Sequence, residues 1–448
     1  MKIGFLPFYI KLYDEVAPAL SAPMRKRAAA VADEFRKRGF SVIEAPVSRV
    51  AAEFFNSVSL LEQQGAEAIL TLHLAYSPSL EAIDALTGTS LPLVILDTTP
   101  DYEFGFDFGD KLMSNHGIHG VQDLCNLLLR RKKTFLIAAG HGEHSSVYDD
   151  AARLLHTAAM ANKMTNARVG VLGGEFAGMG DFRVPDGTFG MQKIEYADQP
   201  CAVPAELKAE IALDRERYIF GHFSDAAYAG TLRASLKLRR WIEKEKLDAF
   251  TISFPGITRA NGFETVPFLE CSKALARGIG YAGEGDVLTA VFISALMASY
   301  PQTTFLEMFC PDWKNNRIFT SHMGEVNLAL TESRPLLSER EYIFSDTGNP
   351  VVATGCLKKG NAILANLAPG PDDTFTLIAG SVEFQSPERP STDCITGWFR
   401  PADMDIADFL RRYSELGGTH HLAAVYGGEL SAFRNFARLM RWNYEEIC

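Results

Sequence analysis

The feature that most constrains the fold is a regular alternation of short apolar segments and helix-like segments over residues 1–140. The apolar segments are rich in Val, Ile, Leu and Phe, which is typical of strands that are buried on both faces of a sheet. Strands that alternate with helices predict a parallel sheet covered by helices on both sides. The predicted strands are residues 2–9, 40–46, 66–73, 91–98 and 134–140, and the clearest amphipathic helix is 24–39. Ligands of such sheets bind beyond the carboxyl ends of the strands, here near Phe8, His73, Asp97 and His141.

The rest of the chain predicts two further domains. Strand patterns at 167–174 and 248–255, with charged helices near 205–215 and 229–245, indicate a second α/β domain. After about residue 310, short strand-like runs separated by turns predict a mostly antiparallel barrel or sandwich. The expected architecture is therefore two Rossmann-like parallel-sheet α/β domains followed by a mostly antiparallel, barrel-like β domain. The expected boundaries are 1–163, 164–310 and 311–448.

Charge and cysteine usage limit the class of protein. The formal net charge of −11 disfavours nucleic acids and anionic membranes as partners. The longest uncharged stretch, 287–306, contains polar residues and Pro301, so we expect a buried helix running into a strand rather than a membrane span. The start of the chain lacks a signal-peptide pattern, and the seven cysteines are scattered without a pairing motif. A reduced, cytoplasmic protein is expected.

Two carboxylates stand out as candidates for chemistry. Glu284 lies in "GEGD" directly before an apolar helix, where an acidic residue is favourable next to the helix dipole. The flanking glycines indicate in addition a close approach to the backbone. Glu307 interrupts the apolar strand "TTFLEMF" (303–309). A buried carboxylate is costly unless it is paired or binds a cation, so Glu307 predicts either a structural salt bridge or a site.

Three histidines are further candidates. His322 lies in the strand-like run 317–326, where a lone histidine is commonly a satisfied, half-buried residue, and Glu325 would face the opposite way on a regular strand. His420 and His421 are consecutive, so on a strand only one of them would face a given site. Mixed Glu and His ligation with open positions suits Mn²⁺, Co²⁺ or Mg²⁺ better than a closed structural zinc site.

The order of these segments resembles the C-terminal half of the L-arabinose isomerase family. The segments are "GYAGEGDVLTA", "TTFLEMF", "FTSHMGEV" and "LGGTHHLAAVY". The resemblance implies an aldose–ketose isomerase in which one Mn²⁺, or another divalent cation, is held by Glu284, Glu307, His322 and His421. His420 would contact the sugar. The related fucose isomerases share the architecture but resemble these segments less closely.

The N-terminal half resembles the same family more weakly. "LMSNHGIHGVQDL" (112–124) aligns His119 with a substrate-binding histidine and His116 with a glutamine of the family. "FTISF" (250–254) places Phe254 near the sugar, and "FYIKLYD" (8–14) keeps Tyr13 but has Ile10 where the family has glutamine. These differences fall at positions that select the sugar, so the substrate is expected to be a pentose or hexose that the resemblance does not name.

The implied mechanism moves a proton between C2 and C1 of the sugar through an enediolate. Glu284 and Glu307 would act as the acid and the base, with the assignment between them open. The resemblance also implies a homo-oligomer, a hexamer or a trimer, in which His119 reaches a neighbouring subunit's site. Two alternatives stay open: a non-catalytic sugar-binding or regulatory protein, and a metal-dependent hydrolase or aldolase, for which no lysine lies in the four segments.

Overall fold

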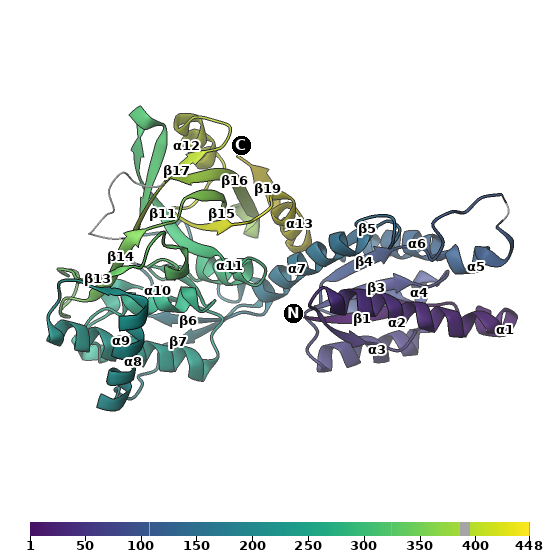
Figure 1. Cartoon of the computed structure of the whole chain (residues 1–448), viewed down its shortest axis with the longest axis horizontal. Helices are drawn as coiled ribbons and strands as arrows, with labels where there is room; N and C mark the ends of the chain where they lie inside the picture. Colours follow the sequence, from purple (N-terminus) through teal and green to yellow (C-terminus); the bar gives the residue numbers. More distant parts are fainter. Residues whose placement is uncertain (107, 324, 386–394, 448) are drawn as a thin grey trace. The chain divides into compact units, whose positions relative to one another are not determined.

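The computed structural model describes residues 1–106, 108–323, 325–385 and 395–447. The chain divides into two compact units, which are described separately. The first unit is Met1–Asn162 with Arg434–Arg441, and the second is Lys163–Phe433 with Trp442–Cys448 (Figure 1). In the described part of the chain, no helix is both long and apolar enough to cross a membrane.

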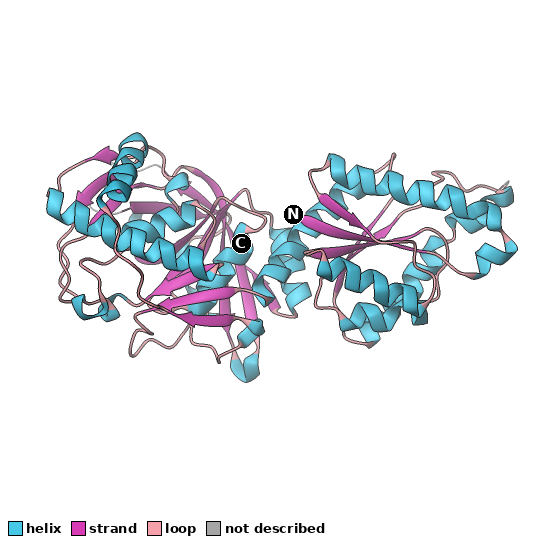
Figure 2. Cartoon of the chain, turned by 90° about the horizontal axis from the view of Figure 1, so that it is seen from below, coloured by secondary structure: helices cyan, strands magenta, loops and turns pink. Residues whose placement is uncertain are grey.

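The first unit is a parallel α/β sheet, as the alternating pattern predicts. Its strand order is β2-β1-β3-β4-β5, and every pairing is parallel. Helices cover both faces of this sheet (Figure 2), and the apolar residues of the strands pack beneath them. The strands are β1 Lys2–Phe8, β2 Ser41–Glu44, β3 Ala68–His73, β4 Leu93–Asp97 and β5 Phe135–Ala139. The helices are α1 Leu12–Val16, α2 Ser21–Lys37, α3 Ala51–Gln63, α4 Ser79–Gly88, α5 Leu112–Asn115, α6 Gly117–Arg130 and α7 Val147–Thr165.

The second unit begins with another parallel sheet, of order β10-β9-β6-β7. Its strands are β6 Arg168–Leu172, β7 Gln192–Glu195, β9 Ala249–Ile252 and β10 Gly280–Gly283. The accompanying helices are α8 Pro204–Arg217, α9 Asp225–Glu245, α10 Phe268–Ala276 and α11 Val287–Met297. All eleven residues of α11 are buried. This burial explains why its sequence is apolar on every side rather than amphipathic.

A closed antiparallel barrel forms the rest of the second unit. Six strands follow one another as β16-β15-β18-β11-β12-β17, and the pairing of β17 with β16 closes the ring. They are β11 Thr303–Asp312, β12 Arg317–Ser321, β15 Gly360–Pro369, β16 Phe375–Gln385, β17 Ile395–Pro401 and β18 His421–Tyr426. The strands β8 Ile219–Phe220, β13 Leu336–Glu339, β14 Val351–Cys356 and β19 Asn443–Glu446 extend the same sheet. The remaining helices are α12 Ile406–Glu415 and α13 Leu430–Met440.

Register within the barrel determines where the site forms. Glu307 on β11 is paired with His421 on β18 and, on its other side, with Ser321 on β12. Paired residues point to the same face of a sheet, so their side chains are neighbours although they lie far apart in the sequence. The apolar residues that alternate with them, Leu306 and Leu422, belong to the barrel core.

Candidate functional site

The turn "GEGD" joins strand β10 to helix α11 and aims Glu284 at the barrel strands. Glu284 has φ +64°, a left-handed conformation that is uncommon for a residue with a side chain. Two backbone hydrogen bonds hold it: Glu284 N donates to Ile252 O (2.7 Å), and Glu284 O accepts from Phe176 N (2.9 Å). Local strain of this kind is typical of functional sites.

The glycines on either side of Glu284 have separate steric roles. A Cβ at Gly283 would lie 3.2 Å from the imidazole of His322. A Cβ at Gly285, where φ is +89°, would lie 2.6 Å from Cα of Glu175. The sequence predicts that other groups approach the backbone closely here. The imidazole of His322 does so at Gly283, and the backbone of Glu175 does so at Gly285.

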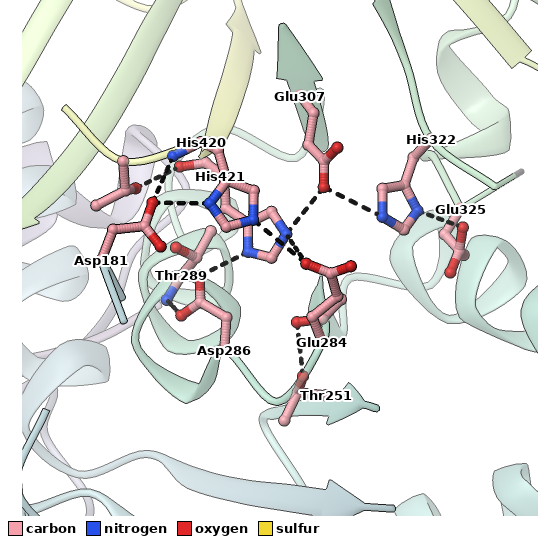
Figure 3. A network of polar contacts seen from close by, with 12 residues as sticks. Asp181, Thr251, Glu284, Asp286, Thr289, Glu307, His322, Glu325, His420 and His421 are labelled. Atoms are coloured by element: carbon pink, nitrogen blue, oxygen red, sulfur yellow. Dashed lines mark hydrogen bonds and ion pairs between the residues drawn. The ribbon is translucent and has the colours of Figure 1, made fainter. Parts of the chain in front are cut away.

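Three imidazoles surround the two carboxylates (Figure 3). His421 Nε2 lies 2.9 Å from Glu307 Oε1 and 3.5 Å from Glu284 Oε2. His322 Nε2 lies 3.3 Å from Glu307 Oε1, and His420 Nε2 lies 3.3 Å from Glu284 Oε2. The candidate site therefore consists of five side chains that meet through two carboxylate oxygens and three Nε2 atoms.

Each imidazole is held from behind by another carboxylate (Figure 3). Asp286 Oδ2 lies 2.9 Å from His421 Nδ1, and Glu325 Oε2 lies 2.5 Å from His322 Nδ1. Asp181 Oδ2 lies 2.7 Å from His420 Nδ1 and also accepts from His420 N (2.9 Å). A carboxylate that keeps a hydrogen on Nδ1 leaves Nε2 as the lone-pair atom of the neutral ring.

Asp286 has two partners at once. Its Oδ1 accepts from Thr289 N (2.8 Å) and caps helix α11, while its Oδ2 contacts His421. The side chains of Asp286 and His421 are both fully buried. Asp286 therefore serves both as the N-cap of α11 and as the partner of His421.

Two expectations from regular strand geometry are wrong. Strand β12 ends at Ser321, so His322 and Glu325 lie in the turn that follows, where their side chains meet. Strand β18 begins at His421, so His420 is not part of it. Both neighbouring histidines reach Glu284 for this reason, rather than only one of them.

The glutamates and histidines of the cluster shift one another's pKa values because they carry opposite charges and are in contact. Burial raises the pKa of Glu284, but the adjacent imidazoles of His420 and His421 outweigh this effect and bring the pKa to about 2. Glu307 is likewise held below its ordinary pKa by His322 and His421 against the effect of burial. Burial lowers the pKa of His322, yet Glu325 and Glu307 raise it to about 10. Carboxylates that attract positive charge this strongly fit a cation site.

The donor set fits a divalent metal. One ligand atom each from Glu284, Glu307, His420 and His421 lies within 4.8 Å of the others. None of the described residues offers the buried Nε2 of His421 a hydrogen bond of good geometry, although Glu307 Oε1 lies 2.9 Å from it. An orphaned imidazole nitrogen between two carboxylates is costly without a further partner. His322 adds a third imidazole through its contact with Glu307.

The predicted sugar contacts fall into both units. Phe254 lies directly after β9 and packs against Phe176 (5.6 Å between ring centroids) and Phe344 (5.3 Å). In the first unit, Tyr13 lies on α1, while His116 and His119 lie at the start of α6 with 2.9 Å between their ring nitrogens. The structure brings Phe254 and the metal-site candidates into one unit, whereas these three residues belong to the other.

Sequence reasoning did not find Asp181 or Phe182. Phe182 is buried and stacks on His421 at 5.4 Å with an interplanar angle of 14°. Both residues lie in a segment without regular structure between β6 and β7. An Asp-Phe pair after "GMG" carries no periodic or motif signal that would single it out.

The sequence of this chain is similar to those of known proteins. Residues 302–443 match the family model of the L-arabinose isomerase C-terminal domain. An L-arabinose isomerase of Herpetosiphon aurantiacus is 24% identical and covers 91% of this chain and 85% of its own length. The L-arabinose isomerase of Bacillus subtilis is 24% identical, and the match covers 81% of this chain and 77% of the relative's length. A periplasmic arabinose-binding protein of Shewanella sp. ANA-3 covers 65% of this chain and 84% of its own, at a TM-score of 0.17, which is too low to argue a shared fold. The chain is thus similar to L-arabinose isomerases over most of its length, and its residues 302–443 match the C-terminal domain of that family.

Proposed function

We propose that this protein is a divalent-metal-dependent aldose–ketose isomerase that acts on a free pentose or hexose. The observation that carries the proposal is the cluster of Glu284 and Glu307 with three imidazoles, each fixed at Nδ1 by its own carboxylate. A sugar-binding or regulatory protein needs neither ionised carboxylates of this kind nor oriented imidazoles. The named relatives support the same reaction class, since each is an L-arabinose isomerase.

Glu284, Glu307, His322 and His421 would hold the metal. His322 and His421 are preferred among the histidines because the carboxylates behind them are fully buried, so their rings have the least freedom. Asp181 behind His420 is 40% exposed, which suits a residue that meets a substrate. Carboxylate and imidazole donors favour Mn²⁺, Co²⁺ or Mg²⁺.

The residues of the chain would carry the proton. The chemistry that a divalent ion supplies in such a site is positive charge, which acidifies the C2–H bond and stabilises an enediolate. One of the two glutamates would remove the proton from C2 and a carboxyl group would return it to C1, while the hydroxyl proton passes from O2 to O1. Both carboxylates have pKa values below the ordinary range, so each is ionised before the reaction. Phe182 and the buried strand residues keep water away from His421.

Further residues would contact the sugar. His420 presents Nε2 beside Glu284 and is our candidate for a hydroxyl contact, and Phe254 would pack against the sugar carbons. We assign Tyr13, His116 and His119 to the distal hydroxyls, in a homo-oligomer (a hexamer or a trimer) where they serve a neighbouring subunit. We place this enzyme in the cytoplasm, where its scattered cysteines remain reduced.

An activity screen tests the proposal directly. Purified protein with added Mn²⁺ is assayed on aldoses and ketoses that include L-arabinose, D-galactose and L-fucose. We expect interconversion of at least one pair, and a loss of about 10²–10⁴-fold in kcat for Glu307→Gln. Glu383→Gln, at an exposed position on barrel strand β16, is the matched control and should keep wild-type turnover. Absence of Mn²⁺ binding together with inactivity on every sugar would refute the function.

A further inference from the structure

A separate cavity lies in the first unit, and none of the site residues assigned above lines it. Its volume is about 400 Å³. Helix α2 forms one wall, the segments after β4 and β5 form another, and Tyr148 of α7 contributes an aromatic ring. The cavity therefore lies at the carboxyl ends of parallel strands, where α/β sheets bind their ligands. Its size falls within the range of small-molecule sites and is much larger than a single water or ion requires.

The guanidinium of Arg27 lines this cavity without an anionic partner. Arg27 donates to Thr98 O at 2.6 Å, and no carboxylate of the described residues forms an ion pair with it. Burial lowers the pKa of Arg27 to about 10. A cation withdrawn from water costs free energy until an anion approaches it. The other arginine of the cavity, Arg38, is already paired with Glu34 and Asp149.

The surroundings of Arg27 offer further donors and ring surface. Tyr148 places its hydroxyl where a Cβ at Gly142 would be only 2.5 Å away, and burial raises its pKa, so it remains a donor. His141 lines the same space and packs against Tyr102, with 5.2 Å between ring centroids.

Two carboxylates also line the cavity, but they do not neutralise the positive charge of Arg27. Glu34 is bound by Lys37 (2.6 Å) and Arg38 (2.9 Å), so its charge is compensated within helix α2. Glu143 is exposed to solvent, where its field is screened. The uncompensated charge inside the cavity is therefore the positive charge of Arg27.

We propose that this cavity binds a small organic anion, a carboxylate or a phosphate monoester, with Arg27 as its counter-charge. The guanidinium presents a planar set of donors that suits either oxyanion. Tyr148 adds a hydroxyl donor, and the aromatic rings pack against the carbon part of the ligand. This site is independent of the proposed isomerase reaction, whose sugars carry no charge.

Anion titrations separate the two ligand sources. The melting temperature is followed with inorganic phosphate and glycerol 3-phosphate in one arm and with acetate and benzoate in the other, at constant ionic strength set with sodium chloride. We expect a saturable rise with at least one organic anion. Arg27→Gln should weaken that binding at least tenfold, and Tyr148→Phe should weaken it less because the ring remains.

The matched control is Arg25→Gln, two residues earlier on α2, which removes the same charge where Arg25 donates to Ser21 Oγ. It should leave the affinity unchanged. The proposal is overturned if no anion gives a saturable rise, or if Arg25→Gln weakens binding as much as Arg27→Gln. A response to inorganic phosphate alone would reduce the site to an adventitious ion. The proposal is also overturned if Arg27→Gln keeps its anion affinity but changes the oligomeric state. In that case the partner of Arg27 would be a carboxylate of a second copy of the chain.

Discussion

Replacement of Asp286 by asparagine tests whether a buried carboxylate sets the metal affinity of the site. Asparagine is as good an N-cap as aspartate, so the hydrogen bond from Thr289 N to the residue at 286 can persist. What asparagine removes is the negative charge that lies 2.9 Å from His421 Nδ1. The substitution therefore changes the orientation and basicity of one proposed ligand while the start of helix α11 is preserved.

The expected magnitude follows from burial. A hydrogen bond to a charged group contributes about 1.5–3 kcal/mol, and this one is fully withdrawn from solvent on both sides. Loss of a carboxylate behind a ligating histidine costs roughly 10–100-fold in metal affinity, which is about 1.4–2.7 kcal/mol. We therefore expect the Kd for Mn²⁺ to rise by about one to two orders of magnitude in Asp286→Asn.

Calorimetric titration of metal-free protein with Mn²⁺ measures this change. Asp286→Ser provides a second variant, because serine also caps a helix but is too short to hold His421, and it should weaken Mn²⁺ binding to the same degree. The control is Asp405→Asn, which alters the aspartate that caps α12 through Asp408 N. Folded Asp286 variants that bind Mn²⁺ as tightly as the wild type would refute the reasoning, whereas a wild type that binds no Mn²⁺ would refute the proposed function instead.

Two further predictions concern histidines. His322→Gln should raise the Kd for Mn²⁺ by about 100-fold, while His420→Gln should leave it nearly unchanged and lower kcat; the opposite result would assign the ligand role to His420. His73 is buried, neither of its ring nitrogens has a hydrogen-bond partner among the described residues, and burial lowers its pKa to about 3. Because the unfolded chain binds the proton more tightly, the stability that neutral His73 contributes is present above about pH 6.5 and is lost as the pH falls toward 3. Denaturant unfolding should show the wild type losing about 2 kcal/mol more than His73→Leu between about pH 7 and pH 5, and parallel pH profiles would contradict the buried-neutral assignment.

The sequence was sufficient for the elements whose pattern is uninterrupted. The strands of the first sheet and the apolar helix α11 follow directly from runs of buried residues, and Glu307 is conspicuous because it breaks such a run. Between the strands that the pattern after residue 310 predicts, β13 ends at Glu339 and β14 begins at Val351. The turn-forming residues that follow include Asp346, which accepts from Arg259 N instead of joining a ladder.

The parts of the site that could not be predicted depend on where strands end. His322 and His420 are each one residue outside a strand, and that single residue decides which way the side chain points. Asp181 reaches His420 across 239 positions of sequence from a segment without periodicity. Local patterns predict which residues are unusual, whereas tertiary packing decides which of them meet.

The closed barrel has a consequence for mechanical coupling. Glu307 and His421 are fixed to adjacent barrel strands, while Glu284 belongs to a turn of the neighbouring parallel sheet. An ion shared by all three would act as a cross-link between the two sheets. Amide hydrogens of the "GEGD" turn and of the ends of β11 and β18 should then exchange more slowly, and together, when Mn²⁺ is added. The same ion that prepares a sugar for proton transfer would in this way limit how far the two sheets separate.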